Sequence, residues 1–219
     1  MIRHTMGQSG GSPQRGSLQR EGTIDGMAGT RVIVGITGAS GTIYGVRLLE
    51  VLQSLGVETH LVMTAAARRV AGLETGYSAA DVEALATYSY ANDEIAAPIA
   101  SGSFRTGGMI VAPCSIKSLS AVANSFNDSL LARAADVCLK ERRKLVLMVR
   151  ETPLHLGHLR LMAQATEYGA IILPPMPAFY HQPTTIADLV DQTVGKVLDQ
   201  FGFEHDLYRR WGGGDAAGG

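Results

Sequence analysis

The chain has 219 residues, of which 46% are hydrophobic and 18% charged, and its formal net charge is −1. This apolar content supports a full core in one sizeable domain and excludes a mostly disordered chain. The near-neutral balance gives no reason to expect nucleic acid or an anionic membrane surface as a partner. The sequence contains no run of about 18 apolar residues, so no membrane-spanning helix is predicted.

Both ends of the chain differ in composition from the middle. Residues 1–29 are rich in Gly, Ser, Gln and Arg without periodicity, and residues 212–219 read GGGDAAGG, so we predict flexible tails around one domain over residues 30–211. The first segment lacks the apolar stretch of a secretory signal. Cys114 and Cys138 form neither a zinc pattern nor a disulfide framework, which fits a reducing compartment such as the cytoplasm.

Strand-like and helical patterns alternate between the tails. Short apolar runs predict strands over residues 31–37, 59–63, 109–112, 144–149 and 170–173. Apolar residues that recur every three or four positions predict helices between these runs. The alternation predicts an α/β protein with a parallel sheet wrapped by helices, whose ligands bind where the strands end.

The loop after the first strand is rich in glycine over residues 38–41. Glycines let the backbone approach a ligand, and a helix start favours an anion. The spacing of these glycines does not match the G-x-G-x-x-G fingerprint of dinucleotide-binding proteins. Ser40 therefore has two interpretations, a helix cap or a group that contacts the ligand. Thr64, after the second strand, has the same two interpretations.

A second polar helix start follows the third strand. Ser115 and Ser118 offer hydroxyls there, and Lys117 offers a positive charge. Two anion-compatible helix starts on one sheet favour a single phosphorylated ligand lying between them. Cys114, just before this helix, is interpreted as a small buried residue.

Charged and aromatic residues follow the last two strands. Arg150 and Glu151 end the fourth strand, either as an internal ion pair or as an anion clamp and an acid–base group. Four prolines stiffen residues 174–183, which present Tyr180 among other aromatic side chains. A rigid aromatic loop suits a flat ring or a small apolar group, and the alternatives are a structural lid or an oligomer contact.

The remaining charged and histidine residues lie on predicted helices. Arg133 and Lys140 are seven positions apart, so they share a helix face and could reach one phosphate. The basic residues that follow are expected to form a solvated face: Arg142, Arg143 and Lys144. His155 and His158 have a spacing that can suit a metal, but no third ligand is apparent, and helix surface is favoured.

Five segments closely resemble the flavin prenyltransferases, the UbiX-like enzymes, in the same order: residues 35–49, 100–104, 113–126, 133–162 and 174–183. The resemblance runs from Arg31 to Trp211. It implies a flavodoxin-like or Rossmann-like three-layer sandwich assembled as a homododecamer. It also implies transfer of a dimethylallyl group, from its monophosphate or pyrophosphate, to N5 and C6 of reduced FMN. The prenylated FMN would serve a UbiD-type decarboxylase, and neither metal nor nicotinamide is expected.

The resemblance also implies roles for individual residues. The expected FMN contacts are Gly38, Ala39, Ser40, Thr64, Ser115, Ile116, Lys117, Ser118 and Arg150. The expected ligands of the prenyl phosphate are Tyr180, Lys196, Arg133 and Lys140. The expected catalytic residues are Ser40, Glu151, Lys140, Arg133 and, as a second carboxylate, Glu74.

Two departures from the family and two rival functions remain. Lys196 stands where several relatives have arginine, and Trp211 is the only tryptophan, whereas some relatives carry one before residues 100–103. One rival is an FMN-carrying subunit of an aromatic acid decarboxylase. The other is an FMN-dependent cysteine-type decarboxylase, against which the basic residues and the aromatic loop argue.

Overall fold

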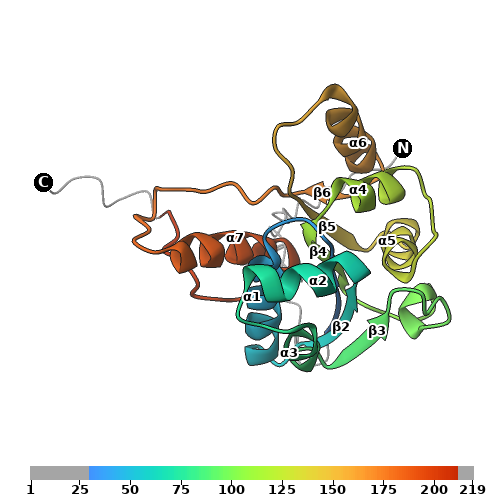
Figure 1. Ribbon diagram of the computed structural model, residues 1–219, viewed down its shortest axis with the longest axis horizontal. Helices are drawn as coiled ribbons and strands as arrows, with labels where there is room; N and C mark the ends of the chain where they lie inside the picture. The colour runs from blue at the N-terminus through green and yellow to red at the C-terminus, as the bar shows by residue number, and fades with distance from the viewer. Residues whose placement is uncertain (1–29, 212–219) are drawn as a thin grey trace, which may run out of the picture.

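The computed structural model describes residues 30–211, so both predicted tails lie outside the described residues. Six strands of this part form one parallel sheet in the order β3-β2-β1-β4-β5-β6 (Figure 1). Their bounds are β1 (Arg31–Ile36), β2 (Glu58–Met63), β3 (Tyr88–Ala91), β4 (Gly108–Cys114), β5 (Lys144–Val149) and β6 (Ile171–Ile172). The predicted parallel sheet is confirmed.

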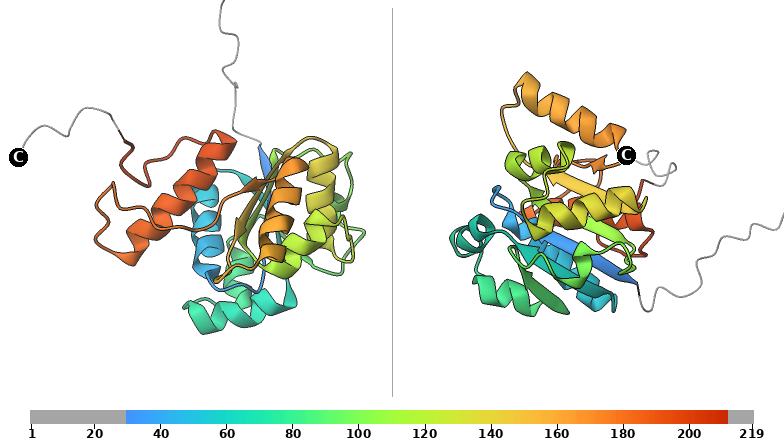
Figure 2. Two further views of the ribbon diagram at one scale, coloured as in Figure 1. Left: turned by 90° about the horizontal axis from the view of Figure 1, so that it is seen from above. Right: turned by 90° about the vertical axis from the view of Figure 1, so that its right-hand side faces the viewer.

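Helices cover both faces of the sheet, which makes three layers (Figure 2). The helices are α1 (Thr42–Ser54), α2 (Ala65–Glu74), α3 (Ala79–Ala84), α4 (Ile116–Ala123), α5 (Leu130–Lys140), α6 (Leu156–Glu167) and α7 (Ile186–Phe201), with a short 3₁₀ turn at Pro98–Ala100. Alternate residues of β1 point to opposite faces. Val32 and Val34 pack with α1, α2 and α7, whereas Ile33 packs with α4 and α5.

The sequence pattern missed only β3 among these strands. This edge strand reads YSYA, is mostly exposed and lacks an apolar run. Without β3, the remaining strands have the flavodoxin order 2-1-3-4-5, and with it they have the Rossmann order 3-2-1-4-5-6. Both descriptions place the point where the strand order reverses between β1 and β4, which is where ligands bind in such sheets.

A buried threonine joins the loops that leave β1 and β4. Thr37 is fully buried, and its hydroxyl donates to the carbonyl of Pro113 at 2.8 Å. The same hydroxyl accepts from the backbone N–H of Ser115 at 2.8 Å, and the Thr37 N–H also donates to Pro113 O at 3.2 Å. One side chain thus fixes the start of α4 relative to the end of β1.

Removing this hydroxyl should weaken the fold. In Thr37→Val the Ser115 N–H loses its partner in a buried setting, so we expect the free energy of unfolding to fall by about 1–3 kcal/mol. Urea unfolding followed by circular dichroism measures the change. Thr37→Ser, which keeps the hydroxyl, is the control and should lose much less. Equal stability of Thr37→Val and the wild type would contradict this role.

Candidate active site

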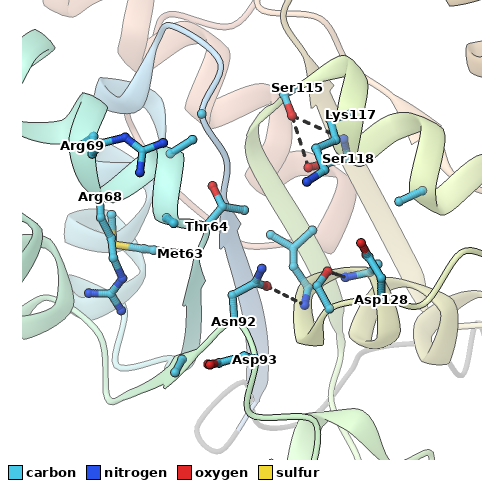
Figure 3. Close-up of a pocket in the computed structure, with 18 residues that line it drawn as sticks. Met63, Thr64, Arg68, Arg69, Asn92, Asp93, Ser115, Lys117, Ser118 and Asp128 are labelled. Atoms are coloured by element: carbon cyan, nitrogen blue, oxygen red, sulfur yellow. Dashed lines mark hydrogen bonds between the residues drawn. The ribbon is translucent and has the colours of Figure 1, made fainter.

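A cleft of about 780 Å³ lies at the carboxyl ends of β1, β2 and β4 (Figure 3). Three loops that are far apart in the sequence meet in it. They bring together five of the residues predicted to contact a flavin: Gly38, Thr64, Ser115, Lys117 and Ser118. The cleft has the size of a pocket for a small molecule or cofactor.

Two helices begin at the wall of this cleft. Thr64 caps α2, because its hydroxyl accepts from the N–H of Ala67 at 3.1 Å. Ser115 caps α4 by accepting from the N–H of Ser118 at 3.3 Å, and it donates to the Ser118 hydroxyl at 3.2 Å. The positive ends of both helix dipoles therefore open on the cleft, where they favour a negatively charged group.

Charged side chains that the sequence analysis did not single out also line the cleft. Arg68 and Arg69 lie on the first turns of α2, and Arg68 pairs with Glu83. Asp93 and Asp128 also line the cleft, and Figure 3 draws Asp128 across the view from the two arginines. The basic pair follows Thr64 by about one helical turn, and that spacing after a strand end is the signal that could have identified it.

The loop over residues 38–41 packs tightly on α2. A Cβ atom on Gly38 would stand 2.4 Å from the Cβ of Ala66, so only glycine lets the loop approach this closely. Gly41 has a φ of 102° and is the N-cap residue of α1, which has no side-chain cap of its own. The alternative in which Ser40 caps this helix is therefore wrong. Ser40 is exposed, and its hydroxyl hydrogen-bonds to the Glu74 carboxylate.

Glu74 supplies the cap that α1 lacks. Its Oε2 accepts from the N–H groups of Gly41 at 2.7 Å and Thr42 at 3.2 Å. Desolvation raises the pKa of Glu74, but hydrogen bonds from Ser40, Gly41 and Thr42 and the charge of Arg150 outweigh it and hold the pKa below its ordinary value. The carboxylate predicted as catalytic thus sits at a helix start with a structural task.

Arg150 and Glu151 follow β5 at the same edge of the sheet. The backbone N–H of Arg150 donates to Cys114 O at 3.0 Å. The positive charge of the Arg150 side chain acts to lower the pKa values of both Glu74 and Tyr44. Burial is the larger influence on Tyr44 and raises its pKa overall. Glu151 is exposed, and its carboxylate accepts from the N–H of Thr152 at 3.0 Å. Arg150 therefore faces the loop that carries Ser40.

Arg133 and Lys140, two of the expected phosphate ligands, lie on α5, away from the cleft lining. Arg133 donates to Ala100 O at 3.1 Å and pairs with Asp136 at 3.0 Å. Lys140 pairs with Glu141 at the end of the helix.

The expected solvated basic face is wrong for Arg143, which donates to the carbonyls of Gly102 and Phe104. Phe104 lies under Arg31, the first residue of β1, so this end of α5 is at the amino edge of the sheet.

Tyr180 and Lys196, the other two expected ligands of the prenyl phosphate, lie across the sheet from α5. The Tyr180 hydroxyl accepts from Gln192 Nε2 at 3.3 Å, and Lys196 Nζ lies 3.8 Å from Asp199 Oδ2 on α7. This helix ends at the amino edge, where Lys144, the first residue of β5, donates to Gln200 O. Lys140 and Lys196 are thus on opposite faces of the sheet, and both lie toward the edge opposite the cleft.

The described part of the chain shows neither a metal-binding cluster nor a membrane-spanning helix. Within residues 30–211 no group of three or more His, Cys, Asp and Glu side chains is arranged to hold a metal ion. The His155 and His158 rings lie with centroids 3.6 Å apart and planes tilted by 38° at the start of α6. Across the same residues, no helix combines the length and the apolar character that crossing a membrane requires.

The fold and the cleft define an α/β protein with an anion-compatible cleft at the carboxyl ends of its strands. The sequence profile of the Flavoprotein family matches residues 24–198. The flavin prenyltransferase UbiX of Thauera aromatica is 64% identical over 185 residues, which cover 84% of this chain and 95% of the relative. UbiX of Escherichia coli K12 is 60% identical over 186 residues, covering 84% and 98%. The chain belongs to the UbiX family of flavin prenyltransferases, which confirms the resemblance.

Solved structures agree with this assignment. AnUbiX (PadA1), in complex with FMN and dimethylallyl pyrophosphate, has a TM-score of 0.82 at 49% identity, covering 83% of this chain and 97% of that one. The dodecameric FMN-dependent UbiX-like decarboxylase of E. coli O157:H7 has a TM-score of 0.82 at 52% identity, covering 83% and 99%. The FMN-dependent cysteine decarboxylase SpaF shares only the fold, with a TM-score of 0.58 at 18% identity.

The cap made by Glu74 should depend on pH. The folded pKa lies below the ordinary value of 4.5, so the stabilisation is fully present above that pH and is lost as the pH falls through the folded pKa. Because Glu74 is exposed, we expect Glu74→Gln to cost only about 0.5–1 kcal/mol at neutral pH. In urea unfolding this difference should shrink below about pH 4. A difference that does not change with pH would contradict the account.

Proposed function

We propose that the chain transfers the dimethylallyl group of dimethylallyl monophosphate or pyrophosphate to N5 and C6 of reduced FMN, without a metal, and that a UbiD-type decarboxylase receives the prenylated FMN. The observation that carries this proposal is the cleft between the starts of α2 and α4, joined to the loop of residues 38–41. The named activity of relatives at 60–64% identity supports the same reaction.

The residues of the cleft fit FMN. A phosphate suits the starts of α2 and α4, because their N–H groups and dipoles are aimed at the cleft. The start of α1 is already neutralised by the Glu74 carboxylate. Residues 38–40 are therefore better suited to an uncharged ring than to a phosphate. Arg150, beside this loop, can hydrogen-bond to ring oxygens.

When bound, reduced FMN supplies the electron-rich ring atoms that the transfer requires. The protein has to neutralise the negative charge that grows on the departing phosphate. Lys140, Lys196, Arg133 and the Tyr180 hydroxyl can do this as cations and hydrogen-bond donors, which is why a metal is not required. Glu151, exposed beside Arg150, or the released phosphate can accept the proton that leaves the ring.

We propose that one chain does not assemble this site alone. Lys140 and Lys196 lie toward the edge of the sheet opposite the cleft, and on different faces. We propose that neighbouring copies in a homo-oligomer, a dodecamer as in the E. coli O157:H7 relative, bring their donor-binding residues to the flavin cleft. Exposed apolar side chains on α6 and the proline-rich loop suit such contacts: Leu156, Leu159, Met176 and Phe179.

Mass spectrometry of the flavin discriminates the proposal from its rivals. The protein is incubated with reduced FMN and either dimethylallyl monophosphate or the pyrophosphate, and the released flavin is weighed. A mass gain of one C5 unit supports transfer, and the faster donor is the preferred one. Bound but unmodified FMN would instead favour a flavin-carrying subunit. Oxidative decarboxylation of a cysteine-ended peptide would favour the other rival, an FMN-dependent cysteine-type decarboxylase.

Ser40 should affect the chemistry more than the fold. Its hydroxyl is exposed and is not the cap of α1, but it hydrogen-bonds to the Glu74 carboxylate that is, so Ser40→Ala should lower the free energy of unfolding by no more than about 1 kcal/mol. Prenyl transfer should slow about 10²-fold if the hydroxyl acts beside the reacting atoms. Ser54→Ala, at the other end of α1, is the matched control. Lost stability with unchanged transfer would assign Ser40 a structural role only.

A further inference from the structure

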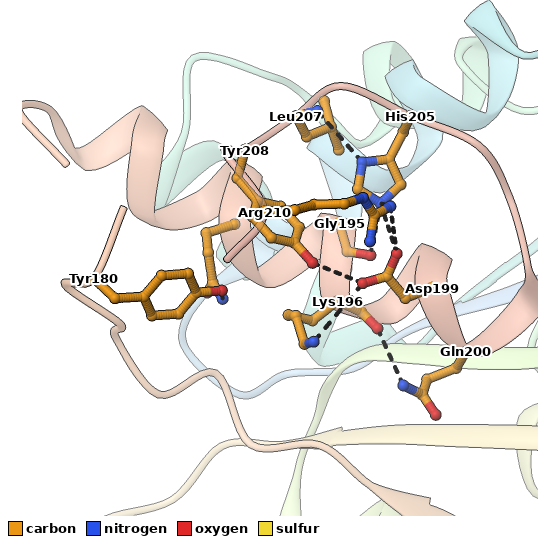
Figure 4. A network of polar contacts seen from close by, with 10 residues as sticks. Tyr180, Gly195, Lys196, Asp199, Gln200, His205, Leu207, Tyr208 and Arg210 are labelled. Carbon is orange, nitrogen blue, oxygen red and sulfur yellow. Dashed lines mark hydrogen bonds and ion pairs between the residues drawn. The ribbon is translucent and has the colours of Figure 1, made fainter. Parts of the chain in front are cut away.

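A carboxylate near the end of α7 gathers the residues that follow this helix. Residues 203–211, which we call the C-terminal arm, fold back along α7 (Figure 4). Asp199 Oδ2 accepts from the Tyr208 hydroxyl at 2.7 Å. Its Oδ1 accepts from Arg210 Nη2 at 2.8 Å and lies 3.2 Å from His205 Nε2. Three side chains of the arm therefore converge on one carboxylate.

The arm lies flush against α7 beside Lys196. A Cβ atom on Gly195 would stand 2.6 Å from the Tyr208 ring and 2.7 Å from the His205 ring, so glycine is required at this contact. His205 Nε2 also lies 3.0 Å from Gly195 O. The residue next to Lys196 is thus the surface on which the arm is seated.

The same carboxylate faces Lys196 directly. Lys196 Nζ lies 3.8 Å from Asp199 Oδ2, which is close enough for attraction but too long for a hydrogen bond. The Asp199 side chain is 19% exposed and that of Lys196 is 48% exposed. Burial raises the pKa of Asp199, but hydrogen bonds and charge from its partners lower it further, so the group stays ionised. The ammonium is oriented while its donors remain open to an incoming anion.

The arm also contacts the aromatic loop. The Trp211 and Tyr180 rings meet edge to face with centroids 6.2 Å apart, and the Tyr208 and His181 rings do so at 6.5 Å. The two residues expected to bind the donor phosphate therefore both contact the arm or its carboxylate: Tyr180 through the Trp211 ring, and Lys196 through Asp199, a pairing that Figure 4 shows.

We propose that Asp199 is a positioning residue for the allyl phosphate: it seats the C-terminal arm on α7 and thereby fixes Lys196 and Tyr180 in the geometry that binds the phosphate. The inference rests on the proposed function, because it takes these two residues as donor ligands. A lysine has a flexible stem and no planar fork, so a fixed neighbouring carboxylate has more to contribute here than beside an arginine.

The test compares Asp199→Asn with Asp191→Asn in the full-length protein. Asp191 is a matched control because it is also on α7, is also paired with an arginine (Arg47 Nε, 2.6 Å) and has a side chain that is 23% exposed. Three quantities are measured: the KM for dimethylallyl phosphate, the KM for FMN, and the emission of Trp211, the only tryptophan of the chain. The wild type, assayed for the C5 mass gain, tests the proposed function separately.

Asp199→Asn should raise the KM for dimethylallyl phosphate by about ten-fold, the effect of weakening a charge-assisted hydrogen-bond network. The Trp211 emission should change with it, while the KM for FMN stays at its wild-type value. In Asp191→Asn all three quantities should stay at wild-type values. An unchanged donor KM, or an equal rise in both KM values, overturns the inference even when the wild type prenylates FMN.

A second variant covers the case in which Asp199→Asn does not fold. Tyr208→Phe removes only the hydroxyl that donates to Asp199. It should raise the donor KM by about three-fold, again without a change in the KM for FMN. An unchanged donor KM in this variant would overturn the inference in the same way.

Discussion

The loops that follow β1 and β4 diverge, because the chain continues from β1 toward β2 and from β4 toward β5. The buried hydroxyl of Thr37 joins them across this gap by bonding to Pro113 O and the Ser115 N–H. Two further features of the site depend on this bridge. It fixes the start of α4 beside the end of β1, and it holds the loop with Ser40 against the same cleft.

The starts of three helices at this edge of the sheet, α1, α2 and α4, are used differently. The starts of α2 and α4 open on the cleft with small hydroxyl caps. The start of α1 is occupied by a carboxylate from the end of α2. Electrostatics thus divides one edge into a part suited to a phosphate and a part suited to an uncharged ring. This division matches a flavin mononucleotide better than a ligand charged at both ends.

Local pattern was sufficient for much of the fold and for several polar residues that line the cleft. Apolar runs predicted five strands, and hydroxyl residues after strands predicted a polar helix start at Ser115 and offered Thr64 as a cap or a ligand contact. The bridge by Thr37 and the cap by Glu74 join residues 76 and 33 positions apart, and no periodicity encodes such contacts. Strand β3 was missed because its packing is that of an exposed edge.

The donor half of the site is where the structure adds most. Resemblance alone assigned Lys140 and Lys196 to the pocket of the flavin, but the fold sends both toward the opposite edge of the sheet. Mixing copies that carry Ser40→Ala with copies that carry Lys196→Ala tests this separation most directly. If neighbouring copies share each site, co-expressed mixed oligomers will transfer the prenyl group faster than either parent variant. Mixed oligomers no more active than their parents would contradict a shared site.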